Sequence, residues 1–145
     1  MLNALTLSQI FVLDQDEALD FYVGKLGFEV SNDVDMGFMR WLTISLPTDP
    51  DRHLLLEVPG PPSLSEEVAA QVRDLLTKGA LGVACILTTD DCRRTYAELS
   101  AKGVEFLQPP SARPYGTEAV CRDNSGNWIV LVQESDRKVV AADFA

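Results

Sequence analysis

One pattern of apolar and polar positions is found twice along the chain. Residues 10–30 run IFVLDQDEALDFYVGKLGFEV, and residues 86–106 run ILTTDDCRRTYAELSAKGVEF. Each stretch combines an apolar β-like run, an acidic helix start, a helix of about three turns and a glycine that ends it. The repeat predicts two pseudo-symmetric copies of one supersecondary unit, and a groove between such units is a natural small-molecule site.

Each copy is predicted to be a β-α-β-β-β unit. In the first, a strand over about 5–13 leads to a helix over about 14–26. Asp14 or Asp16 caps this helix and Gly27 ends it. Three further apolar runs predict the remaining strands, over about 28–34, 38–46 and 53–58.

The second copy repeats this order. A strand over about 82–89 precedes a helix over about 90–102, which Asp90 or Asp91 caps and Gly103 ends. The remaining strands are expected over about 104–107, 117–122 and 128–134, with a hairpin turn at 124–127. Between the copies, a proline-rich stretch ends the strand and Ser65 caps a linker helix.

Four stretches carry a family pattern: VLDQDEALDFYVGKLGFEV (12–30), RWLTISLP (40–47), TTDDCRRTYAELSAKGVEF (88–106) and YGTEAVCRDNSGNWIVLVQ (115–133). On these the chain resembles the vicinal oxygen chelate superfamily, which includes glyoxalase I, extradiol dioxygenases and bleomycin-resistance proteins. The resemblance implies an α+β fold in which two βαβββ modules form an eight-stranded open cup, with helices on its outer face. It implies one domain over 1–145, with module 1 over about 4–58, a linker helix over 59–80, module 2 over about 81–134 and a tail over 135–145.

The same resemblance implies four positions at which metal-dependent members carry ligands. They fall here on Leu7, Ala84 and Val130, with the fourth on His53 or Leu54. A divalent ion needs at least three N, O or S donors, and leucine, alanine and valine supply none. We therefore expect no metal and no other cofactor, and a cup floor suited to apolar contact.

The alternation of side chains along a strand identifies further residues that could line this floor and bind a ligand. If Leu7 and Val130 face inward, neighbours at a spacing of two also do, and Trp41 joins them from the third strand. The two tryptophans then offer a stacking surface for a planar or cationic ligand, although each could instead fill the core or an interface. The candidate ligand-binding residues are Leu7, Gln9, Phe11, Trp41, Ala84, Trp128 and Val130.

Three polar residues are candidates for catalysis. His53 and Glu57 are four apart, so they share one strand face and could form an acid/base pair. They meet the helix layer or solvent instead if Leu54 faces inward. Tyr115 lies with Arg113 in a Pro- and Gly-rich loop at a cup rim, where binding residues are common.

The net charge of the chain limits the classes of molecule that it is expected to bind. The chain has 12 Lys and Arg against 22 Asp and Glu, a net charge of −10. This argues against nucleic acid, because phosphate binding needs clustered basic residues, and it favours neutral or cationic ligands. With no apolar run near the length of a membrane span and no basic leader, we expect no membrane partner and a cytoplasmic location.

These observations support one main hypothesis and two others. The first is a metal-free protein, expected to be a homodimer, that binds an apolar or aromatic small molecule in the cup. The second is a divalent-metal-dependent lyase or dioxygenase of the same superfamily, which the missing ligands oppose. The third is a metal-independent enzyme using His53, Glu57 or Tyr115.

Overall fold

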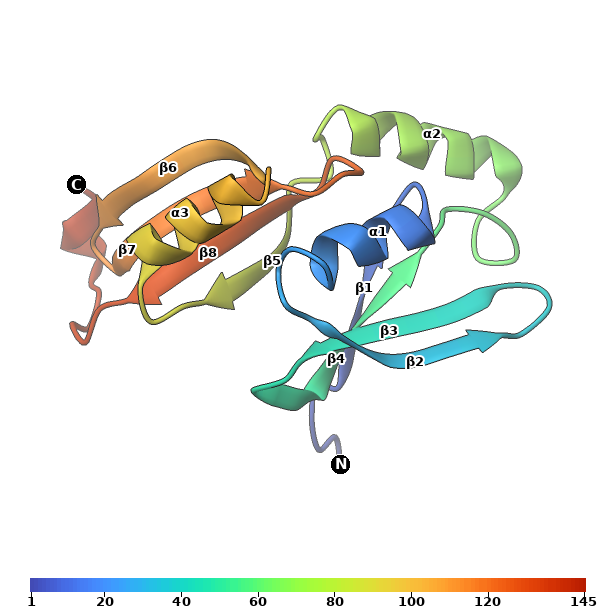
Figure 1. The fold of residues 1–145 in the computed structure, drawn as a ribbon, viewed down its shortest axis with the longest axis horizontal. Coiled ribbons are helices and arrows are strands. Elements are labelled where there is room, and N and C mark those ends of the chain that lie inside the picture. The colour runs from blue at the N-terminus through green and yellow to red at the C-terminus, as the bar shows by residue number, and fades with distance from the viewer. The chain divides into compact units, whose positions relative to one another are not determined.

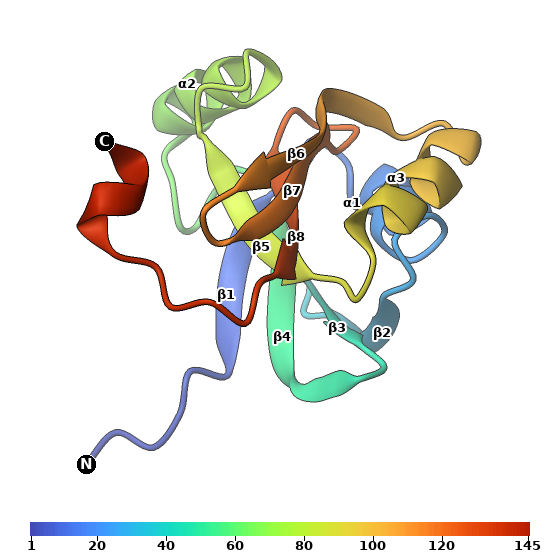
Figure 2. The same cartoon turned by 90° about the vertical axis from the view of Figure 1, so that its left-hand side faces the viewer.

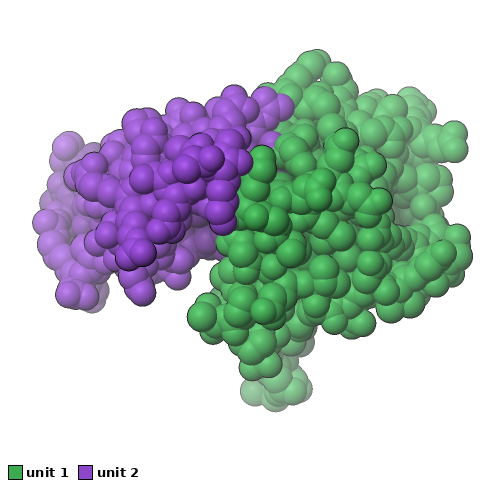
Figure 3. Space-filling model, in the orientation of Figure 1, with its two compact units in different colours: residues 1–80, 124–126 green, residues 81–123, 127–145 purple.

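The computed structural model describes residues 1–145, which form two compact units (Figure 3). One comprises 1–80 with 124–126, and the other comprises 81–123 with 127–145. Each holds a four-stranded mixed sheet and repeats the βαβββ order, which confirms the predicted α+β fold of two modules. The main division between the units falls after residue 80. That the whole chain is one domain stays a prediction.

The first unit has the strand order β1-β4-β3-β2, with β1 parallel to β4 and the other pairs antiparallel (Figure 1). Asp14 caps its first helix by accepting a hydrogen bond from the Glu17 amide at 2.8 Å. Ser65 caps the linker helix in the same way. The elements are β1 (Leu7–Phe11), α1 (Gln15–Tyr22), β2 (Glu29–Asp35), β3 (Arg40–Leu46), β4 (Asp49–Glu57) and α2 (Glu66–Thr77).

The second unit has the matching order β5-β8-β7-β6, with β5 parallel to β8. Asp91 caps α3 by accepting from the Arg94 amide at 3.0 Å. Figure 2 shows the coil after β8, which ends in the short helix η1. The elements are β5 (Val83–Thr88), α3 (Cys92–Ala101), β6 (Glu105–Arg113), β7 (Gly116–Arg122), β8 (Trp128–Glu134) and η1 (Ala141–Phe144). No helix of the chain has both the length and the apolar character needed to cross a membrane.

Three predicted boundaries were wrong. Helix α1 ends at Tyr22 rather than near 26, because the amide of Gly24 bonds back five residues and glycine is a poor helix former. Strand β4 begins at Asp49, where it closes a hairpin with β3. Strand β6 runs on to Arg113, because it is an edge strand and tolerates its prolines while pairing with β7.

Helices α1 and α3 each cover one face of the sheet in their own unit. In the first unit the buried strand residues surround Tyr22, which is fully buried and meets Phe21 and Phe28 edge-on. In the second unit the buried strand positions lie with Cys92 and Leu99 of α3. The buried strand residues on these helix-covered faces are Ile10, Val12, Leu42, Ile44 and Leu56, and then Ala119, Cys121, Ile129 and Leu131. Side chains on the opposite faces remain for other roles.

Candidate functional site

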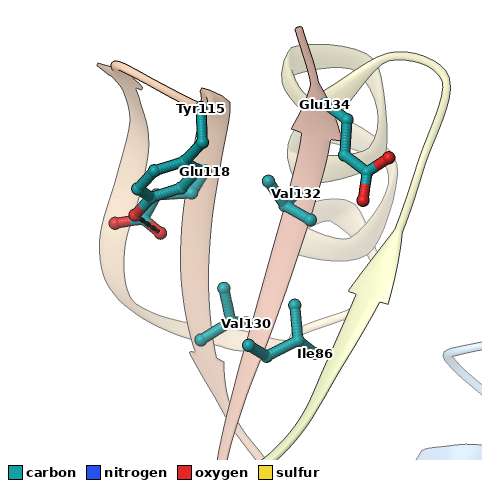
Figure 4. A pocket seen from close by; sticks show the side chains of 6 residues that line it. All are labelled: Ile86, Tyr115, Glu118, Val130, Val132 and Glu134. Carbon is teal, nitrogen blue, oxygen red and sulfur yellow. Dashed lines mark hydrogen bonds between the residues drawn. The ribbon is translucent and has the colours of Figure 1, made fainter. Parts of the chain in front are cut away.

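A hollow of about 300 Å³ lies on the face of the second sheet opposite α3. Along β8, Ile129 and Leu131 are buried on the helix side, so Val130, Val132 and Glu134 point the other way. All three line the hollow. Figure 4 shows Val130 at its base with Val132 and Glu134 further along the same strand.

Neighbouring strands complete the lining. Ile86 of β5 lies opposite Val130 in the register, and Glu118 of β7 lies opposite Val132. Tyr115 joins them from the turn between β6 and β7. Ile86 is 63% exposed although it is a large apolar side chain. The hollow therefore presents apolar surface to whatever enters it.

A hydrogen-bonded cluster forms one wall of the hollow. The Tyr115 hydroxyl donates to Glu118 Oε2 at 2.5 Å, beside it in Figure 4. Arg113 Nε donates to Glu118 Oε1 at 3.0 Å, and Arg113 Nη2 donates to Gln108 Oε1 at 3.2 Å. These contacts fix the Glu118 carboxylate in place.

The cluster sets the protonation of its members. The hydrogen bond to Glu118, together with burial, raises the pKa of Tyr115 above its usual value. Burial alone would raise the pKa of Glu118, but the hydrogen bonds from Tyr115 and Arg113 outweigh burial and lower it. Near neutral pH the proton therefore stays on Tyr115, and Glu118 is ionised.

The face of the first sheet opposite α1 carries the other two catalytic candidates. Leu7 lies opposite His53 and Phe11 lies opposite Glu57, so His53 rather than Leu54 shares a face with Leu7. His53 Nδ1 is 3.0 Å from Ser31 Oγ.

Glu57 has a different partner, because its Oε1 accepts from Ser63 Oγ at 3.2 Å. His53 is thus bonded to one serine and Glu57 to another, rather than to each other. Tyr115 belongs to the second unit. The structure therefore gives each of the three catalytic candidates its own local environment.

Both tryptophans lie away from the helix-covered faces. Trp41 lines a shallower hollow of about 340 Å³ in the first unit, with Asn32, Val34 and Met36. Trp128 alternates with the buried Ile129, shares the face of Val130 and is 39% exposed. Both indoles are thus placed where stacking on a ligand is sterically open, and their use in binding stays a prediction.

The residues present do not fit the divalent ion that superfamily enzymes use. Leu7, Ala84 and Val130 carry no donor atom, and His53 adds only one. No three His, Cys, Asp or Glu side chains come together in a set that could hold a metal ion. We therefore derive no chemical step through a metal.

Sequence reasoning missed three lining residues, Ile86, Glu118 and Glu134. Two of them were visible in principle, because Ile86 is two positions after Ala84, and Glu134 continues the alternation of Val130. Glu118 depends on the pairing of β7 with β8, which the sequence does not specify to one residue.

Comparison with known proteins places this architecture in a family. The family described as the Glyoxalase/Bleomycin resistance protein/Dioxygenase superfamily matches residues 3–131. The chain belongs to that superfamily. The match covers both βαβββ modules up to β8, and it confirms the resemblance found in the sequence.

Individual proteins are similar to this chain in sequence or in structure. The uncharacterized protein YurT of Bacillus subtilis (strain 168) is 39% identical over 131 residues, which are 90% of this chain and 98% of YurT. The crystal structure of UcmS2 is 46% identical with a TM-score of 0.87, covering 92% of this chain and 100% of UcmS2. TnmS3, an antibiotic binding protein from Streptomyces sp. CB03234, is 30% identical with a TM-score of 0.73, covering 92% of this chain and 98% of TnmS3.

Proposed function

We propose that this protein binds an apolar or aromatic small molecule without a metal and without converting it. The observation that carries the proposal is the apolar base of the hollow, which the exposed Ile86 lines together with Val130 and Val132. Small-molecule sites in proteins are concave and mainly apolar, with a few polar groups that orient the ligand. The base of this hollow and the Tyr115–Glu118 wall have that composition.

The similarity to TnmS3 supports a proposal for the class of ligand that this protein binds. It is an antibiotic binding protein, 30% identical over 92% of this chain. We propose that the ligand here is likewise an antibiotic-like natural product, held by sequestration. The ligand-binding residues proposed from the sequence remain part of the proposal: Leu7, Gln9, Phe11, Trp41, Ala84, Trp128 and Val130.

Metal analysis tests the first half of the proposal. Protein purified without added metal should hold far less than one equivalent of Zn, Ni, Fe or Mn, because Leu7, Ala84 and Val130 cannot ligate. A chelator should leave the melting temperature unchanged, because no metal-binding free energy is linked to folding. Stoichiometric metal, or melting that falls on chelation, would favour the lyase or dioxygenase alternative.

Ligand binding tests the second half. Aromatic antibiotics and small aromatic probes are screened by thermal shift, and hits are titrated by tryptophan fluorescence. If Trp128 is a stacking wall, Trp128→Ala should lose about 1–3 kcal/mol of binding free energy, by analogy with base–aromatic stacking. Leu75→Ala on α2, where Leu75 is exposed in the first unit, is the matched control and should bind normally. The same comparison applies to Trp41→Ala.

Turnover separates a binding protein from an enzyme. A bound ligand incubated with the protein should be recovered unchanged by mass spectrometry. Conversion that His53→Ala, Glu57→Gln or Tyr115→Phe abolishes would instead establish a metal-independent enzyme. Two wider parts of the proposal, a homodimer and a cytoplasmic location, are tested by light scattering of the purified protein and by cell fractionation.

A further inference from the structure

The polar side chains that line the hollow all accept hydrogen bonds. This property limits which polar groups a ligand can carry on its apolar body. The base consists of the hydrocarbon side chains of Ile86, Val130 and Val132. The other lining residues are Tyr115, Glu118 and Glu134 (Figure 4). A few groups of this kind fix the orientation of a ligand in an otherwise apolar site.

Tyr115 can act towards a ligand only as an acceptor. A phenol has one proton to donate, and that of Tyr115 is committed to Glu118 Oε2 at 2.5 Å. Arg113 holds the other Glu118 oxygen, so the carboxylate stays where it receives this proton. The phenol oxygen therefore has no proton left for a ligand, and it can only accept.

The two carboxylates are acceptors for a simpler reason. Ionised Asp and Glu have no proton to give. The pKa of Glu118 is lowered by its hydrogen bonds, so it is charged near neutral pH. Glu134 is an exposed residue that also lines the hollow. Arg113 is not among the lining residues, and its Nε and Nη2 donate to Glu118 and Gln108. Every side-chain polar group that lines the hollow therefore accepts.

We propose that the hollow selects an apolar or aromatic molecule whose edge carries hydrogen-bond donors, as hydroxyl or ammonium groups, and disfavours the same body bearing acceptors or negative charge. This inference rests on the proposed function and names the ligand chemistry of the same site. A ligand that offered only acceptors would cover the Glu134 carboxylate without giving it a hydrogen bond, which costs binding free energy. A ligand anion would also meet the negative charge of Glu134, whereas the charge of Glu118 is paired with Arg113.

Four probes with one aromatic body test the inference by calorimetric titration near neutral pH. Naphthol and methoxynaphthalene differ by one donor, whereas naphthylmethylamine and naphthoate differ in charge. Naphthol should bind about fivefold more tightly than methoxynaphthalene, the ratio that one net hydrogen bond supplies. The amine should bind at least about tenfold more tightly than naphthoate, and added salt should narrow that ratio.

A charge reversal localises the effect. Glu134→Lys should shift the ratio of amine to naphthoate affinity towards naphthoate by about tenfold or more, because a cation then faces the hollow. Glu98→Lys makes the same charge change on the surface of α3, where Glu98 is exposed and pairs only with Arg94 in this unit. It should leave the ratio nearly unchanged. Glu134→Gln gives an intermediate result if the charge is the cause.

The outcomes separate this inference from the proposed function. If all four probes bind with equal affinity, or if Glu98→Lys shifts the ratio as much as Glu134→Lys, the donor rule is wrong while the binding function stands. If none of the four binds to the unaltered protein, the proposed function fails and the inference with it. Preference for naphthoate over the amine also overturns the donor rule.

Discussion

The two units have one topology but differ on the sheet face that their helices leave uncovered. An aspartate caps the helix in both, at Asp14 and Asp91, and a glycine with φ of 86° follows the helix in both, at Gly27 and Gly103. Opposite α1 the first unit has His53 bonded to Ser31, whereas opposite α3 the second unit has Val130 beside Ile86. Caps and glycine stops specify the backbone, so the two faces are free to differ in chemistry.

The helix-covered cores differ too, and this gives the largest expected effect. Tyr22 of α1 is fully buried with Phe21 at 5.0 Å and Phe28 at 5.8 Å, whereas Tyr96 of α3 is half-buried and pairs with the ring of Phe106 at 4.6 Å. Tyr22→Ala should destabilise the protein by about 3–5 kcal/mol. Tyr96→Ala should cost roughly 1–2 kcal/mol, because less area is lost.

Urea unfolding measures both costs, with Trp41 reporting on the first unit and Trp128 on the second. Tyr22→Phe and Tyr96→Phe are the matched controls, since each keeps the ring and removes only the hydroxyl. Equal costs for the two alanine variants would contradict the packing difference between the units.

Cysteine gives a second contrast, because all three cysteines lie in the second unit. Burial raises the pKa of Cys85 to about 12 and that of Cys121 to about 12. Only thiolate reacts with iodoacetamide, so native Cys85 should react about a thousandfold more slowly than in the unfolded chain. Mass spectrometry at increasing urea then follows the opening of the second unit alone.

The sign of the pH effect follows from these shifts. A thiol whose folded pKa exceeds its unfolded value contributes stability that is present below about pH 9 and is lost as pH rises towards 12. Native Cys85 that reacts as fast as the denatured protein would show that its strand is already open.

A substitution at Val130 tests the difference between the apolar face of the second sheet and the polar face of the first. Val130→Glu introduces the carboxylate that metal-dependent relatives are expected to have, but at a site that is only 9% exposed and lined by Ile86 and Val132. We expect a loss of about 2–3 kcal/mol of stability near neutral pH, smaller at acidic pH where the carboxyl is protonated. His53→Glu, on the polar face, should cost less.

Neither variant should acquire metal, because Leu7 and Ala84 still supply no donors. Thermal unfolding and metal analysis of both variants measure these outcomes. Stoichiometric metal in Val130→Glu would mean that donors outside the four family positions complete a site.

The repeat, the helix caps and the order of the strands could be predicted from the sequence, because they depend on local signals of only a few residues. Ser65 and the aspartate caps were readable for that reason. The lining of the hollow depends on register, which distant pairings set: Glu118 faces Val132 only through the β7–β8 ladder. The extent of β6 past Pro110 was likewise unreadable, since it follows from its place at the sheet edge.

The smallest expected effect comes from comparing the two corresponding hairpins. In the β2–β3 hairpin, Arg40 donates two hydrogen bonds of 2.9 Å to the Asp33 carboxylate. In the β6–β7 hairpin, Arg113 and Tyr115 both donate to the Glu118 carboxylate. The first pair has no group that titrates in alkali, because the pKa of Asp33 is lowered by its Arg40 bonds. The second has Tyr115, whose pKa is raised above 10.0.

Tyr115 should therefore give the second hairpin an alkaline dependence that the first lacks. Since its folded pKa exceeds its unfolded value, its contribution is present below about pH 10 and is lost as pH rises through the folded pKa. Tyr115→Phe should cost less than about 1 kcal/mol near neutral pH, since the bond is partly solvated. It should also make the decline in alkali shallower, while the part of the decline that Cys85 and Cys121 cause remains. Urea midpoints from pH 7 to 11 measure this, with Tyr96→Phe as the control that keeps the decline. A decline that persists unchanged in Tyr115→Phe would place the alkaline titration elsewhere, and the Tyr115 proton would then not be held by Glu118 in solution.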